Sequence, residues 1–174
     1  MTSQNIAWSW RWPEISAALL VSQAVAETFK NHKQSRWKFE RGGQLFVDPK
    51  RSEGLVLALA TRPHTDDKAG WSWLQLDKKR CEVEINESNK RGLRLIGYWH
   101  THPESSPQIS KQDVKSFELF ARQNQSELPQ PLAVIVGTKP FPDGIKAWSL
   151  RPHGEMMSAI PIIQSQQQKK ECYE

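Results

Sequence analysis

The 174-residue sequence predicts a single α/β domain, with a β-sheet and helices packed around one core. Short apolar runs bounded by turn residues predict buried strands at residues 55–60, 93–99 and 132–137. Residues 13–31 and 110–125 carry apolar side chains at intervals of three and four, which is the pattern of an amphipathic helix. Strands and helices that alternate along a chain of this length favour an α/β fold.

The composition fits a folded protein and excludes several other classes. Hydrophobic residues make up 37% of the chain, which contains eight tryptophans. No apolar run approaches the roughly 18 residues of a membrane helix, and the N-terminus shows no secretory signal. Two cysteines make no disulfide framework, and the net charge of +5 permits an acidic partner without identifying one. We therefore expect a cytoplasmic protein that makes no contact with a membrane.

The two ends of the chain differ in character. Trp8, Trp10 and Trp12 alternate, so an extended segment would carry all three on one face. We expect this face to pack on the domain, and the alternative is an exposed aromatic surface for a partner. The polar residues 164–174 predict a disordered tail that follows a domain of residues 1–163.

Further elements are predicted between these ends. Residues 37–47 predict a strand with Phe39 among its apolar positions, and its Gly42-Gly43 pair indicates a bulge or a close approach of another backbone. Asp77 can cap a helix over residues 78–90, whose mixed charges are typical of a solvated face. Other short strands are expected near residues 71–76, 145–151 and 160–163.

The residues that carry chemistry begin where the strand at 93–99 ends. His100 and His102 lie two positions apart, so on an extended segment both imidazoles point the same way and can reach one ion. Asp113 follows eleven residues later with a carboxylate. Three such nitrogen and oxygen ligands leave the fourth tetrahedral position of a zinc ion open for water. A pair of surface histidines is the alternative that this spacing alone leaves open.

Two of the candidate residues also have ordinary structural interpretations. Ser110 and Asp113 form the S-x-x-D pattern of a helix capping box, which needs no metal, although capping and metal binding can coexist. Glu40 lies sixty residues before the first histidine and, taken alone, fits an ordinary strand residue. A zinc hydrolase, however, needs a carboxylate that does not bind the metal. This carboxylate takes a proton from the zinc-bound water and later gives it to the departing amine.

Taken together, these residues resemble the signature of the JAMM (JAB/MPN) zinc metalloproteases. The resemblance spans roughly residues 37–150 and implies a single JAB/MPN domain with a mixed central β-sheet flanked by helices. It also implies that His100, His102 and Asp113 bind Zn²⁺, that Glu40 is the general acid/base, and that Ser110 helps to stabilise the oxyanion. The matching positions are Glu40, Gly42, Gly43, Leu45, His100, His102, Pro103, Ser110 and Asp113.

The resemblance also implies a class of substrate. The usual substrates of this family are bonds that follow the C-terminal glycines of ubiquitin or ubiquitin-like proteins, and an extended tail suits pairing with a strand edge. The chain looks most like the small bacterial members, which include the deconjugating peptidase of type II CBASS anti-phage systems. This implies as partners a ubiquitin-like or cGAS-like nucleotidyltransferase (CD-NTase) tail conjugated to lysine, and a ubiquitin-transferase-like protein from the same operon. Residues 62–92 would be the insertion that shapes the substrate groove.

Three other functions stay open at this point. A peptidase that processes a ubiquitin-like or sulfur-carrier precursor would use the same chemistry, and a non-catalytic MPN scaffold would bind partners without a complete ligand set. A nucleic-acid-binding module on residues 78–94 is disfavoured by the interleaved glutamates. Gln44, Val47 and Ile109 depart from the family pattern around the site, which leaves the substrate's identity open.

Overall fold

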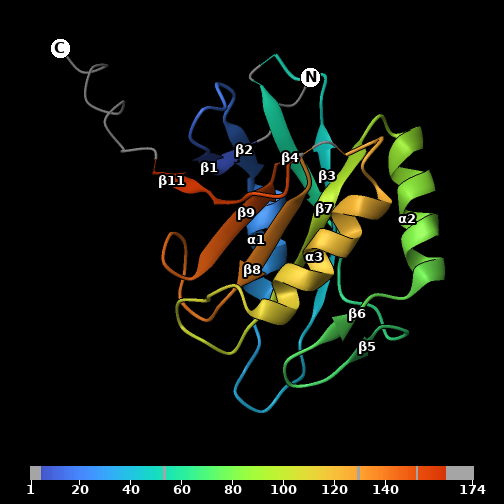
Figure 1. The fold of residues 1–174 in the computed structure, drawn as a ribbon. Helices are drawn as coiled ribbons and strands as arrows, with labels where there is room; N and C mark the ends of the chain where they lie inside the picture. Colours follow the sequence, from blue (N-terminus) through green and yellow to red (C-terminus); the bar gives the residue numbers. More distant parts are fainter. Residues whose placement is uncertain (1–4, 53, 129, 152, 164–174) are drawn as a thin grey trace.

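A large mixed β-sheet forms the centre of the protein, as the computed structural model shows (Figure 1). The structure describes residues 5–52, 54–128, 130–151 and 153–163, and the tail predicted at residues 164–174 lies outside them. The strands of the sheet are β1 (Ile6–Arg11), β2 (Leu19–Ser22), β3 (Gly42–Asp48), β4 (Leu55–Ala60), β7 (Arg94–Thr101), β8 (Leu132–Val136), β9 (Ile145–Leu150), β10 (Met156–Ser158) and β11 (Ile160–Ile162).

Within the described residues these nine strands lie in the order β10-β9-β8-β7-β3-β4-β2-β1-β11. The pairs β2–β4 and β7–β8 are parallel, and the other neighbours are antiparallel. The predicted mixed α/β fold is therefore confirmed. The central position of β7 matters most for the site, because β3 and β8 pair with it on both sides and fix the strand that leads to the two histidines.

Helices cover both faces of the sheet. These are α1 (Gln23–Asn31), α2 (Lys78–Lys90) and α3 (Lys111–Gln123). Val134 of β8 belongs to the core that Phe29 of α1 enters, whereas its neighbour Ala133 belongs to the core that Phe117 of α3 enters. Successive residues of a strand point to opposite faces, so α1 and α3 lie on opposite sides of the sheet, as Figure 1 shows with α3 in front and α1 behind.

The caps of α2 and α3 agree with the sequence. Asp77 accepts a hydrogen bond from the backbone N–H of Arg80, and Ser110 forms a reciprocal capping box with Asp113. A separate antiparallel hairpin of β5 (Lys68–Ala69) and β6 (Leu74–Gln75) lies below the sheet in Figure 1. None of the helices in the described ranges is long and apolar enough to cross a membrane.

The N-terminal tryptophans pack on the domain. Trp8, Trp10 and Trp12 are all buried, and the ring of Trp8 stacks on Phe141 with 4.4 Å between centroids. The indole N–H of Trp12 donates to the backbone carbonyl of Met157. The expectation of a packed face is confirmed, and the alternative of an exposed aromatic surface at these residues is wrong.

The helix predicted over residues 13–31 is wrong in its first half. Residues 19–22 form β2, in which Leu19 and Val21 are buried and pair with β4, and the helix begins only after Ser22. The apolar spacing fits both a helix and a strand here, and parallel pairing with a strand distant in sequence decides between them. The side chain of Ser22 accepts a hydrogen bond from the N–H of Val25 and so caps the shorter helix.

The strand predicted over residues 37–47 begins five residues later, at Gly42. Trp37 and Phe39 precede it and are exposed, so the expectation that Phe39 is an apolar strand position is wrong. The close backbone approach predicted for the glycine pair is present. A Cβ atom on Gly42 would collide with the carbonyl of Trp99, and one on Gly43 with the carbonyl of Thr61.

Candidate active site

The two histidines extend from the end of β7 into a buried position. His100 pairs with Gly42 of β3 on one side and with Ile135 of β8 on the other, and the N–H of His102 donates to the carbonyl of Val136. Both imidazoles are buried and face the same side of the strand, with Thr101 between them facing the other. Neighbouring strands on both sides therefore hold the two rings in place.

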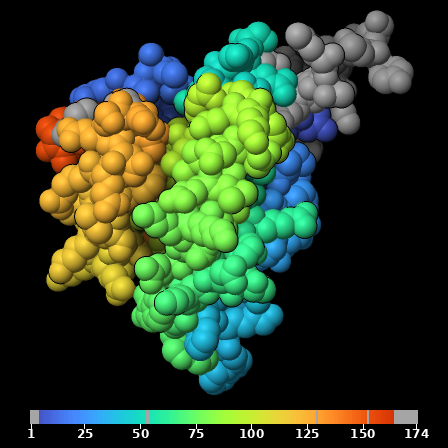
Figure 2. All heavy atoms as spheres, turned by 90° about the vertical axis from the view of Figure 1, so that its right-hand side faces the viewer, coloured from blue at the N-terminus to red at the C-terminus, as the bar shows by residue number. Residues whose placement is uncertain are grey.

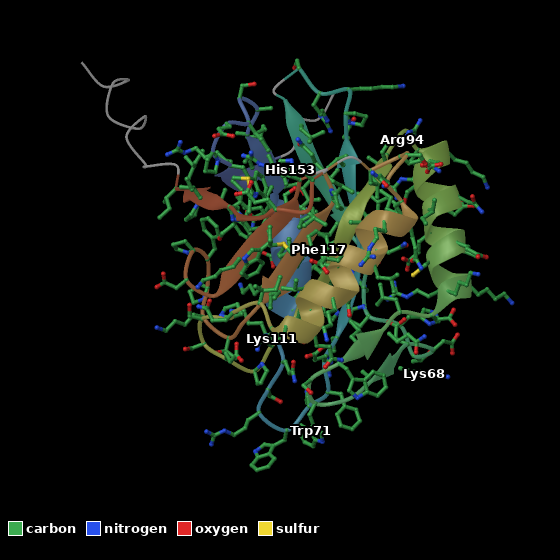
Figure 3. All side chains as sticks on the ribbon, viewed as in Figure 1. Lys68, Trp71, Arg94, Lys111, Phe117 and His153 are labelled. Carbon is green, nitrogen blue, oxygen red and sulfur yellow. The ribbon has the colours of Figure 1, made fainter. Side chains whose placement is uncertain are left out.

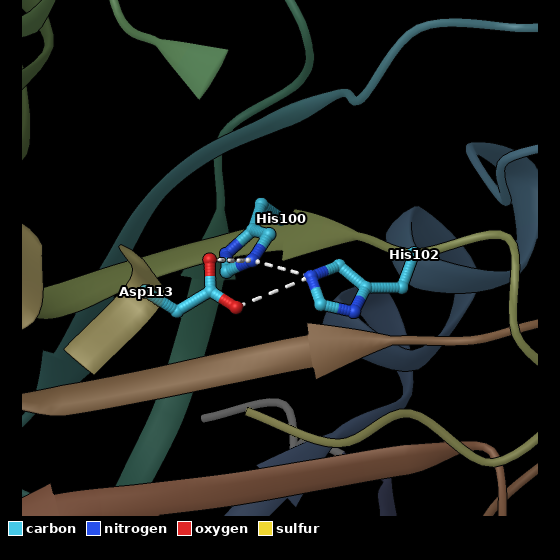
Figure 4. Close-up of side chains that lie close together, drawn as sticks. All are labelled: His100, His102 and Asp113. Carbon is cyan, nitrogen blue, oxygen red and sulfur yellow. Dashed lines mark hydrogen bonds and ion pairs between the residues drawn. The ribbon is translucent and has the colours of Figure 1, made fainter. Parts of the chain in front are cut away.

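Three potential ligand side chains converge at one point (Figure 4). The Nε2 atoms of His100 and His102 lie 3.1 Å apart, and Asp113 places Oδ1 3.1 Å from His100 Nε2 and Oδ2 3.4 Å from His102 Nε2. Ligand atoms at the usual zinc distance of about 2.0–2.1 Å and in tetrahedral arrangement would be about 3.3 Å apart. The spacing and the chemistry of this donor set therefore fit Zn²⁺.

Asp113 is positioned by the first turn of α3. The N–H of Ser110 donates to Asp113 Oδ2 at 2.8 Å, and the N–H of Asp113 donates to Ser110 Oγ at 3.0 Å. Burial alone would raise the pKa of Asp113, but its hydrogen bonds with His100 and His102 outweigh burial and lower that pKa below its usual range. The carboxylate therefore stays ionised, as a metal ligand must.

Glu40 lies beside the three ligand atoms, just before β3. Its Oε1 is 3.9 Å from His102 Nε2, and its backbone N–H donates to the carbonyl of Gly70 at 2.9 Å. Burial of the side chain raises the pKa of Glu40 from 4.5 to about 7. A carboxylate whose pKa is near neutral can both accept and return a proton, which is what general acid/base chemistry requires.

Ser110 stands at the edge of the site rather than within it. Its side chain is exposed, and its Oγ already accepts the capping hydrogen bond from Asp113. A hydroxyl has one donor and two acceptor positions. The cap uses an acceptor position only, so the hydroxyl proton is left for another partner.

A cavity of about 200 Å³ opens onto the cluster. Its apolar wall comes from the hairpin and the segment that follows it, within the predicted insertion at residues 62–92, and its floor from β7 and α3. The lining residues are Glu40, Ser72, Trp73, Leu74, Leu76, Tyr98, His100, Gln112, Asp113 and Ser116.

Two residues near the site, Glu104 and Gln34, are not among the residues predicted from the sequence. Glu104 Oε2 lies 3.4 Å from Nδ1 of His102, so a proton on Nδ1 leaves Nε2 free to face the site. The sequence feature that could have indicated Glu104 is a carboxylate two residues after the candidate ligand His102. Gln34 is buried and accepts a hydrogen bond from the hydroxyl of Thr101, and no local pattern indicates that contact across 67 residues.

The fold is a mixed sheet with helices on both faces, and it brings two histidines from β7 and its end together with an aspartate of α3, as expected from the resemblance to the JAB class of α/β domains. Residues 22–151 match the family described as prokaryotic homologs of the JAB domain, and the chain belongs to that family. A solved structure from Desulfitobacterium hafniense shares the fold, with a TM-score of 0.55 and 14% identity over 82% of this chain and 88% of that one.

Relatives with a stated activity are also found. A protein of Enterobacter hormaechei subsp. hoffmannii described as a CD-NTase/cGAS isopeptidase is 28% identical over 60% of this chain. That match spans 57% of the relative's own length, which is less than two thirds of it. A Pseudomonas aeruginosa protein with the same description is 26% identical over 74% of this chain and 83% of the relative.

Proposed function

We propose that this protein is a zinc-dependent isopeptidase that releases a cGAS-like nucleotidyltransferase (CD-NTase) from a lysine to which its C-terminus has been joined, as part of CBASS anti-phage defence. The descriptions of the Enterobacter and Pseudomonas relatives support this substrate. The observation that carries the reaction type is the convergence of His100, His102 and Asp113 at zinc-like spacing, with the carboxylate of Glu40 beside them.

Each residue at the site has a defined part in the proposed reaction. Zn²⁺ held by His100, His102 and Asp113 would polarise the scissile carbonyl and lower the pKa of a bound water. Glu40 takes a proton from the attacking water and delivers it to the lysine nitrogen as the C–N bond breaks, so that the tail leaves as a carboxylate and the lysine as an amine. The hydroxyl of Ser110 donates to the carbonyl oxygen while negative charge builds on it.

The surroundings of Glu40 suit this proton transfer. Burial raises the pKa of Glu40 above its ordinary value of 4.5, which makes the carboxylate a stronger proton acceptor, and the positive charge of a bound Zn²⁺ would act in the opposite direction. Glu104 orients His102 through Nδ1 and thereby helps to keep Nε2 directed at the metal position. A scaffold that only binds partners has no need of three metal-ligating side chains with the carboxylate of Glu40 beside them.

Cleavage of a defined conjugate tests the proposal. The zinc-loaded protein is incubated with a bacterial cGAS-like nucleotidyltransferase joined through its C-terminus to a lysine, and with the same tail in a linear peptide bond. We expect release of the nucleotidyltransferase from lysine, loss of release when a chelator removes zinc, and recovery when zinc is returned. Cleavage of the linear bond alone would identify a processing peptidase instead, and cleavage of neither would overturn the proposal.

A further inference from the structure

Three exposed aromatic side chains gather at one end of the molecule, beside the cavity. Trp37, Phe39 and Trp71 are 80%, 51% and 56% exposed, and we call this set the aromatic rim. The loop of Trp37 and Phe39 and the hairpin of Trp71 form the lower end of the face in Figure 2, and Trp71 lies at the lower tip in Figure 3. Large apolar side chains grouped on a surface in this way commonly mark a binding site.

The rim is continuous with the catalytic cavity. Phe39 directly precedes Glu40, and Trp71 directly precedes Ser72 and Trp73, all three of which line the cavity. The rings of Phe39 and Trp71 contact each other edge to face, with 5.3 Å between centroids. A chain that leaves the cavity on this side therefore meets the rim next.

A buried hydrogen-bond network fixes the rim to the catalytic strand. The hydroxyl of Thr101, between the two histidines, donates to Oε1 of Gln34 at 3.1 Å. The side-chain amide of Gln34 donates to the carbonyl of Lys38 at 2.8 Å and approaches that of Trp71 at 3.5 Å. One buried side chain thus holds both rim segments, so the aromatic groups are presented at a fixed position relative to the metal site.

We propose that the aromatic rim binds the C-terminal tail of the conjugated protein, at a large apolar side chain upstream of the scissile bond. This inference rests on the proposed function. Conjugates of one protein to different lysines share that protein and not the lysine-bearing partner, and the tail is the part of it that must pass from the cavity along the adjoining rim. Arg36, Lys38 and Lys68 are exposed on the same segments, so acidic residues beside that apolar side chain complete the chemistry of the preferred tail.

The double substitution Trp37→Ser, Phe39→Ser tests the rim by binding and by kinetics. Fluorescence anisotropy of a labelled peptide, carrying about ten C-terminal residues of a cGAS-like nucleotidyltransferase, measures affinity without any turnover. We expect Kd to rise at least about tenfold, as for truncation of aromatic anchors in other interfaces. We also expect KM for the full conjugate to rise, while kcat/KM for a short isopeptide that ends before the rim stays unchanged.

Val83→Ser is the matched control, because Val83 is 55% exposed but lies on α2, outside the rim. It should change neither Kd nor KM. An unchanged peptide Kd in the rim variant would overturn the inference, as would an equal loss on the short substrate, which would indicate a distorted site. A change only in self-association would assign the rim to a second copy of the chain instead. Failure of the proposed function gives a different result from failure of this inference, because the wild-type protein would then cleave neither the full conjugate nor the short isopeptide.

Discussion

Replacement of Ser110 by alanine separates its structural role from its proposed catalytic role. The substitution removes the Oγ that accepts a 3.0 Å hydrogen bond from the N–H of Asp113. Loss of a serine N-cap costs about 1 kcal/mol of stability. A domain with about 5 kcal/mol of stability, the low end of the normal range, would still be more than about 99% folded. Unfolding therefore accounts for almost none of any loss in rate.

The catalytic role predicts a much larger effect. Removal of one hydrogen-bond donor to an oxyanion lowers kcat by about 10²–10³-fold in enzymes that use such a donor. We expect Ser110→Ala to lower kcat on the conjugate by that amount while the zinc content is retained. Thermal unfolding and steady-state kinetics on the same preparation measure the two effects independently.

Ser22→Ala is the matched control for Ser110→Ala. Ser22 caps α1 by accepting from the N–H of Val25, on the opposite face of the sheet from α3. It should lower stability by a similar amount, about 1 kcal/mol, and leave kcat unchanged. If Ser110→Ala behaves like Ser22→Ala, with a lower melting temperature and less than about a twofold change in kcat, Ser110 is a helix cap only and the oxyanion role is refuted.

Two further predictions concern Arg80, whose buried guanidinium hydrogen-bonds to Asp67, Glu84, Thr61 and the carbonyl of Gly42. Arg80→Met leaves buried acceptors without their cation, so we expect a loss of about 3–5 kcal/mol in urea unfolding, and an unchanged midpoint would contradict this. For Asp67, burial acts to raise the pKa, but the hydrogen bond from Arg80 and the other contacts lower it. Stability from this group is thus present above the unfolded pKa of about 3.9 and lost as pH falls through the lower folded pKa. The unfolding free energy should fall more steeply below pH ~4 in the wild-type protein than in Asp67→Asn. Parallel curves for the two proteins would show that the Arg80–Asp67 ion pair does not make stability depend on pH.

Features that depend on adjacent residues could be predicted from the sequence. The caps at Asp77 and Ser110 follow from side chains that bond to N–H groups three positions away, so the starts of α2 and α3 were correct. The spacing of His100 and His102 at a strand end likewise determines that both rings face the same side. The meeting of these rings with Asp113 and Glu40 was expected only through resemblance to a family signature.

Features that depend on distant pairing could not be predicted in this way. Leu19 fits the apolar spacing of the predicted helix, and only parallel pairing with β4, some 36 residues later, makes it part of a strand. Phe39 looks like an apolar position of a strand that starts at Trp37, yet the pairing of β3 with β7 begins at Gly42 and leaves both residues outside the sheet. The contact of Gln34 with Thr101 is likewise visible only once the chain is folded.

The most direct test of the central claim is the zinc content and cleavage rate of Glu40→Gln. The substitution keeps the size of the side chain and removes its ability to exchange a proton, while His100, His102 and Asp113 are untouched. We predict about one zinc per chain, as in the wild-type protein, and at least about a 10²-fold loss of kcat on the lysine-linked conjugate. Cleavage at a wild-type rate with zinc bound would contradict the assignment of Glu40 as the acid/base that completes this site.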